Sequence, residues 1–92
     1  MVSGFNHLEL GEVVKGSTKL NEETSVEFLK MVQNGKPLIC SFMHSDTGRF
    51  SVVMNCIGRT GYIAYVYPFF IFSISVESVG VFVTLEYLNT EE

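Results

Sequence analysis

The sequence predicts one α+β domain, in which an antiparallel meander of four to six strands carries one helix (about residues 22–34) on one face. Strong helical periodicity with start and stop signals occurs only between Asn21 and Asn34. The other segments are short runs rich in β-branched and aromatic residues, separated by glycine-containing turns. Helix and strands do not alternate along the chain, which favours α+β over α/β. With 92 residues, the chain is expected to form a single domain over residues 1–92.

The first 20 residues alternate apolar and polar positions only briefly. Leu8 and Leu10 have polar neighbours, and Gly11 interrupts the alternation. The pattern resumes at Val13 and ends at Gly16. It predicts either a short strand pair or an extended arm, and the pattern alone leaves both open.

The predicted helix has signals at both ends. Thr24 and Glu27 have the spacing of a capping box, and Asn21 is a competing N-cap. Gly35 suits the position after the helix, and Pro37 prevents the helix from resuming. A broad apolar stripe should pack on the sheet, and it consists of Val26, Phe28, Leu29, Met31 and Val32.

A hairpin is expected to follow the helix. Strands at residues 38–44 and 49–57 flank a turn at residues 45–48, and the expected register pairs Cys40 with Met54. The core face should then carry Leu38, Cys40, Phe42, Phe50, Val52, Met54 and Cys56. The opposite face is mixed in character and carries Ile39, Ser41, Met43, Ser51, Val53 and Asn55.

The last third of the chain is expected to add three strands. A turn at residues 58–61 leads into a strand at 62–67, which Pro68 should end because proline cannot donate to a ladder. Strands at 69–76 and 81–88 then form a hairpin.

Two signals disagree about the register of that last hairpin. A left-handed turn at Gly80 would pair Ile74 with Thr84, whereas the apolar alternation pairs Ile74 with Val83. We expect the second register, because a one-residue slip moves every side chain to the opposite face.

The charge distribution argues against two classes of partner. The net charge is −4, and it arises from residues 60–92, which contain glutamates and no base. A nucleic-acid-binding protein needs clustered Lys and Arg, so no nucleic acid is expected as a partner. Residues 61–76 carry no charge but are shorter than the roughly 20 apolar residues of a spanning helix, so no membrane insertion is expected.

The cysteines and histidines do not form a recognisable metal or catalytic motif. The two cysteines are not a close Cys-x-x-Cys pair, so no metal site and no cofactor are expected. His44, Ser45 and Asp46 contain the residue types of a hydrolase triad, but sequence adjacency is not triad geometry, and Ser45 and Asp46 are ordinary turn residues. No catalytic residue is predicted, and the protein is not expected to be an enzyme. The two cysteines and the lack of a signal-like N-terminus predict a reducing, cytoplasmic location.

A glycine-rich turn offers a candidate anion site. Arg59 lies between Gly58 and Gly61, whose backbone could bind an anion, and Arg49 is a second candidate. Arg49 and Arg59 lie at opposite ends of one predicted strand, so only an oligomer could bring them together.

An aromatic band occupies the last third of the chain. The side chains that would point to one face of a strand there are apolar, and so are most of those that would point to the other face, as in a strand covered on both faces. Aromatic residues are also enriched in interface cores, so we expect an interface at Tyr65, Tyr67, Phe69 and Ile71.

These features predict a small non-enzymatic binding module that acts as a homo-oligomer and engages a protein partner. An inhibitor or accessory role, including one in a virus or phage, is compatible with a small acidic fold. One alternative is a small-ligand or nucleotide-sequestering protein with a pocket between subunits. The other is an enzyme whose site is assembled across subunits.

Overall fold

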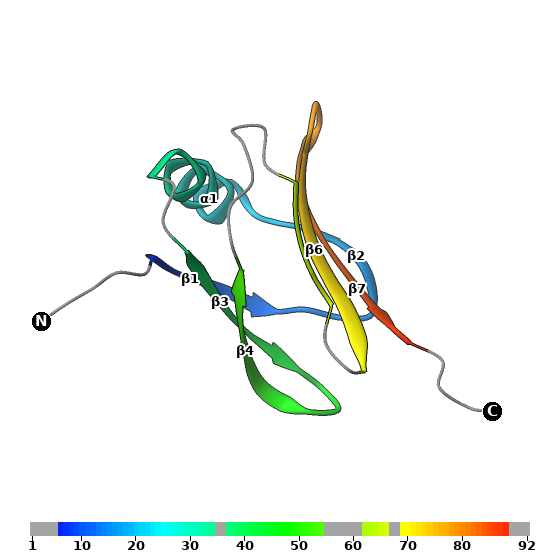
Figure 1. The fold of residues 1–92 in the computed structure, drawn as a ribbon. Helices are drawn as coiled ribbons and strands as arrows, with labels where there is room; N and C mark the ends of the chain where they lie inside the picture. The colour runs from blue at the N-terminus through cyan, green and yellow to red at the C-terminus, as the bar shows by residue number, and fades with distance from the viewer. Residues whose placement is uncertain (1–5, 35–36, 55–61, 67–68, 89–92) are drawn as a thin grey trace, which may run out of the picture.

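The α+β class is confirmed by a computed structural model that describes residues 6–34, 37–54, 62–66 and 69–88, with only the backbone of residues 62–65. The chain forms one helix and seven strands among these residues (Figure 1). Their bounds are β1 (Asn6–Glu12), β2 (Gly16–Lys19), α1 (Glu22–Asn34), β3 (Leu38–His44), β4 (Gly48–Met54), β5 (Tyr62–Val66), β6 (Phe70–Glu77) and β7 (Gly80–Tyr87).

The strands divide between two sheets rather than forming one continuous meander. Sheet A has the order β1-β3-β4, with β1 parallel to β3, and sheet B has the order β2-β7-β6-β5 and is antiparallel throughout. The first 20 residues contribute two strands, but these pair with β3 and β7 and not with each other. Of the two alternatives, residues 6–19 therefore form strands, but the two strands are not paired with each other. Two sheets with one apolar face each bury those faces against one another.

The hydrophobic core lies between the inner faces of the two sheets. The rings of Phe42 and Phe72 stack with their centroids 5.2 Å apart, and Phe50 meets Phe70 edge to face at the same distance. Such aromatic pairs add stability beyond the area they bury. These contacts join sheet A to sheet B directly.

The helix lies beside sheet A, at the end of the molecule away from the turn between β3 and β4 (Figure 1). Phe28 and Val32 are buried in the shared core, and Met31 packs against it. Val26 and Leu29 are exposed, so the buried stripe is narrower than the sequence predicted. Among the described residues there is no second helix to cover these two side chains.

The N-terminus of α1 is capped by Asn21. Its Oδ1 accepts a hydrogen bond of 2.8 Å from the backbone N–H of Thr24. The capping box with Thr24 as the cap is therefore wrong, and the competing cap is the one that forms. The helix begins directly after Asn21, as expected for this position.

The register of β3 and β4 differs from the expected one by two residues. Cys40 pairs with Val52, not Met54, and His44 pairs with Gly48. Gly48 has φ 80°, so the left-handed glycine lies inside the ladder and shortens the turn. A shift of two preserves the faces, and the core face is confirmed for the described residues, with Phe50 half-buried.

The register of β6 and β7 is confirmed. Ile74 pairs with Val83, and Glu77 pairs with Gly80. Phe72, Ile74 and Val83 are all buried, so the apolar pattern did determine the pairing.

Candidate binding surface on sheet A

A β-bulge in β1 determines which side chains the outer face of sheet A presents. Glu9 pairs with Ser41, but Gly11 pairs with the next residue, Phe42, so Leu10 is the extra residue. Gly11 has φ 77°, a conformation that favours glycine. Because of the bulge, Glu9 and Glu12 share the outer face although they are three residues apart.

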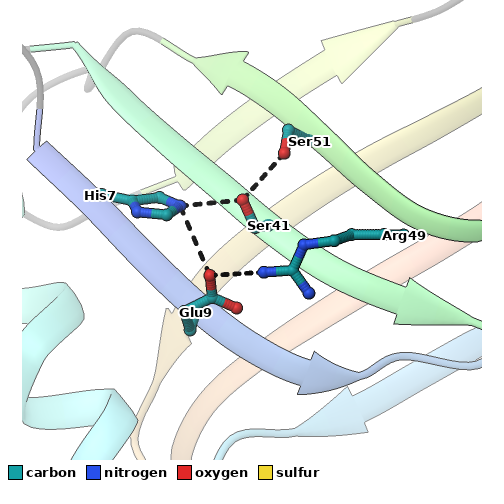
Figure 2. Close-up of polar contacts among 5 residues, drawn as sticks. All are labelled: His7, Glu9, Ser41, Arg49 and Ser51. Atoms are coloured by element: carbon teal, nitrogen blue, oxygen red, sulfur yellow. Dashed lines mark hydrogen bonds and ion pairs between the residues drawn. The ribbon is translucent and has the colours of Figure 1, made fainter.

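A polar network crosses all three strands on this face (Figure 2). Nε2 of His7 lies 2.8 Å from Oγ of Ser41, which lies 2.8 Å from Oγ of Ser51. The guanidinium of Arg49 donates a 2.8 Å hydrogen bond to Oε2 of Glu9, which lies 3.6 Å from Nε2 of His7. The network connects β1, β3 and β4 side by side.

The combination of serine, histidine and glutamate in this network does not have the geometry of a catalytic triad. In a triad, the carboxylate binds one ring nitrogen and the serine binds the other. Here Ser41 and Glu9 both approach Nε2 of His7, and no described carboxylate contacts Nδ1. Ser41 is also only 3% exposed, so its hydroxyl is closed to a substrate. The network therefore lacks the arrangement that a serine–histidine–carboxylate mechanism requires.

Apolar side chains lie around the polar network. Met43 is 45% exposed and Val53 is 50% exposed, while Ile39 is half-buried. We define the outer face of sheet A as three rows of three residues: His7, Ile39 and Val53; Glu9, Ser41 and Ser51; Glu12, Met43 and Arg49. Among the described elements, α1 lies beside the β1 edge of this face, where His7 and Glu9 line a cavity with Glu23 and Glu27. An exposed sheet face with Met and Arg among ordered polar groups resembles the composition of protein interfaces.

A second polar contact joins the two sheets. Nδ1 of His44 accepts a 3.2 Å hydrogen bond from the backbone N–H of Asp46, and Oη of Tyr87 lies 2.8 Å from Nε2 and 3.1 Å from Nδ1 of the same ring. His44 is 5% exposed. Desolvation, and secondarily the Asp46 carboxylate, raises the pKa of Tyr87 above its ordinary value of 10.0. Ser45 and Asp46 thus lie in the turn, as expected, and His44 is the last residue of β3, paired with Gly48.

Two cavities flank the helix. One of about 420 Å³ lies between β1 and the first half of α1, and its lining includes Glu9, Glu23 and Glu27. Another of about 570 Å³ lies between the start of α1 and the turn before β7. The described residues contain no group of histidine, cysteine and acidic side chains placed to hold a metal ion.

Of the four predicted interface residues, the structure describes Tyr65 by its backbone, Phe69 and Ile71, and Tyr65 and Ile71 lie on different strands. The chain reverses between β5 and β6, and this places Tyr65 opposite Phe72 and Ile71 opposite Val66. Ile71 is half-buried. Phe69 is 67% exposed at the end of sheet B, and Tyr67 lies outside the described residues.

Of the predicted anion site, the structure describes only Arg49, whose guanidinium is bound to Glu9. Arg59 and its flanking Gly58 and Gly61 lie outside the described residues, as does Cys56. Cys40 is buried on the core face beside Met54, as expected of a small hydrophobic side chain.

The sequence patterns did not predict the polar network on the outer face of sheet A. The alternation of β3 and β4 did place Ser41 and Ser51 on one mixed face. His7 and Glu9 join them only because β1 pairs in parallel with β3, a contact between distant segments that local patterns do not reveal.

Comparisons with known proteins do not assign a function. No known family matches the chain, and no similar curated protein or solved structure was found. Among the described residues, no helix has the length and apolar character needed to cross a membrane. Function must therefore be argued from the geometry of the molecule.

Proposed function

We propose that this protein is a small non-enzymatic binding module that acts as a homo-oligomer. One observation carries the proposal: the outer face of sheet A holds an ordered polar network among exposed apolar side chains, Met43 and Val53. A face of this kind loses little conformational entropy when it binds, because the network already fixes its polar groups.

The geometry of the polar groups supports binding over catalysis. The serine nearest to a histidine is buried, and the histidine lacks a carboxylate on its second nitrogen among the described residues. The alternative of an anion pocket between subunits has less support, because Arg49 is the only Lys or Arg among the nine residues of the outer face of sheet A. The buried thiol of Cys40 suits a reducing environment, and we infer a cytoplasmic location from it.

Native mass spectrometry and sedimentation velocity over a wide concentration range test this proposal. We expect a concentration-dependent oligomer of the bare chain. A monomer at every concentration would contradict the homo-oligomer. A stoichiometric added mass of a few hundred daltons would instead support the ligand-binding alternative.

A further inference from the structure

We propose that the oligomer is a two-fold dimer in which the outer faces of sheet A pack together, with the axis parallel to β3. In this dimer, Arg49 of each copy lies against Glu12 of the partner subunit. The inference rests on the proposed self-association and names the surface and the contacts that produce it.

The first support is the way charge is distributed over the outer face of sheet A. Glu9 and Glu12 lie on β1, and Arg49 lies on β4. The middle strand, β3, contributes only uncharged residues: Ile39, Ser41 and Met43. The two acidic residues of this face are therefore attached to one outer strand and its arginine to the other, with the Arg49 guanidinium reaching over β3 to Glu9.

This distribution is complementary to itself. A two-fold axis along β3 places β1 of one copy over β4 of the other, and it leaves β3 facing its own copy. Glu12 and Arg49 flank Met43 in one row, so the rotation brings Arg49 over Glu12 of the partner subunit. Each dimer forms this contact twice, with Ile39 and Met43 meeting their own copies near the axis.

The second support is the state of the two charged groups in the single chain. Glu12 forms no ion pair with any described residue. Arg49 contacts only Glu9 among the described acids, and a guanidinium has five N–H donors. Arg49 can therefore keep its bond to Glu9 and also bind a second carboxylate. The dimer supplies that carboxylate and pairs Glu12 at the same time.

The size of the face limits the strength of the dimer. Three strands spaced about 4.8 Å apart form a narrow surface. It buries less than the roughly 800 Å² per partner of a standard protein interface. We therefore expect a dissociation constant in the micromolar range or weaker, so the measurements must reach high protein concentration. Sheets that pack face to face with nearly aligned strands fit the proposed axis.

Charge reversal at the two positions tests the arrangement. In Glu12→Lys, Lys at position 12 faces Arg49 of the partner subunit, and in Arg49→Glu, two glutamates face each other. We expect each variant alone to weaken the homodimer about a hundredfold, because like charges opposite each other at an interface are strongly unfavourable. Sedimentation velocity measures the effect. Both positions are exposed, and circular dichroism should show an unchanged fold.

Mixing the two variants separates the proposal from any effect within one chain. In the mixed dimer, both contacts join opposite charges. Native mass spectrometry of the mixture should therefore show a heterodimer at concentrations at which each variant alone does not dimerise. The double variant carrying both changes should regain the homodimer. Glu86→Lys is the matched control, since Glu86 is exposed on sheet B, and it should leave the dimer constant unchanged.

The outcomes distinguish this inference from the proposed function. If the unaltered chain is a monomer at every concentration, both fail. If it forms an oligomer that neither variant weakens and the mixture yields no heterodimer, the homo-oligomer stands and this interface is wrong. If the unaltered chain stays monomeric but retains a different protein through this face, the second copy is the wrong occupant.

Discussion

The two sheets share one core, yet their outer faces differ. On the outer face of sheet A, side-chain hydrogen bonds join His7 to Ser41, Ser41 to Ser51 and Arg49 to Glu9, so they connect all three strands. On β6 and β7, the outer face of sheet B carries Ser73, Ser75 and Thr84 together with the half-buried Ile71 and Phe82. The side-chain hydrogen bond described on that face joins Ser75 to Glu77 within one strand. Burial of an inner face thus leaves the outer faces free to differ, and the binding surface that we propose lies on the sheet whose polar groups are held across strands.

The largest effect is expected where the two sheets meet. Phe72→Ala removes a fully buried ring that stacks on Phe42, and we expect a loss of about 3–5 kcal/mol in the free energy of unfolding. Urea unfolding, followed by circular dichroism and by fluorescence, should show one transition in both proteins. Two separate transitions would mean that the sheets unfold independently. Their outer faces could then not be compared as two sides of one folded unit.

The next largest effect is a difference in the free energy of unfolding between two serine-to-alanine variants, one in each sheet. Ser41→Ala removes a buried hydroxyl bonded to His7 and Ser51, and should cost about 1–2 kcal/mol. Ser73→Ala, on the outer face of sheet B, should stay within about 0.5 kcal/mol. Paired urea titrations provide the measurement. Equal losses at both positions would show that the network of sheet A is not special.

The contact of Tyr87 with His44, which joins the two sheets, should contribute about 1 kcal/mol to the free energy of unfolding, the usual net value of one hydrogen bond. Tyr87→Phe removes the hydroxyl that contacts the ring of His44. Because the pKa of Tyr87 is raised in the folded state, the native protein keeps a proton that the unfolded chain loses above pH 10. Unfolding free energy should therefore fall as the pH rises above about 10. The fall should be shallower in Tyr87→Phe, and an identical slope in both proteins would remove this residue as its source.

The smallest effect is expected at the ion pair of sheet A. The side chains of Arg49 and Glu9 are 58% and 52% exposed, and exposed pairs contribute little to stability. Arg49→Met should change the free energy of unfolding by less than about 0.5 kcal/mol at moderate salt. Denaturation in low and high salt gives the check. A loss above about 2 kcal/mol in the free energy of unfolding would mean that the ion pair stabilises the fold, and it would weaken the argument that Arg49 acts in association.

Local patterns predicted the elements better than the partners of those elements. The bounds of α1 and the pairing of Ile74 with Val83 follow from periodicity, because only one arrangement buries the apolar residues. The pairing of Cys40 was off by two, since an alternating pattern cannot distinguish shifts of two residues. There, the left-handed Gly48 decided the register.

The candidate surface was harder to predict than the fold. Ser41 and Ser51 were placed on a common face, because neighbouring strands of a hairpin reveal their relation in the sequence. His7, Glu9 and Glu12 reach that face through a parallel pairing over a long sequence separation and through the bulge at Leu10. Neither feature leaves a periodic signal, so the charge pattern of the face became visible only in three dimensions.

The pairing of β2 with β7 has a consequence for the order of events during synthesis. A ribosome completes residues 16–19 early, but their partner strand consists of residues 80–87. Until that distant segment emerges, β2 has no ladder to join, and the inner face of the incomplete sheet B stays in water. The hairpins of β3–β4 and β6–β7 can close locally and quickly, whereas β2 must wait until β7 has been synthesised. The nascent chain is therefore most vulnerable to aggregation and to chaperone capture just before β7 is complete.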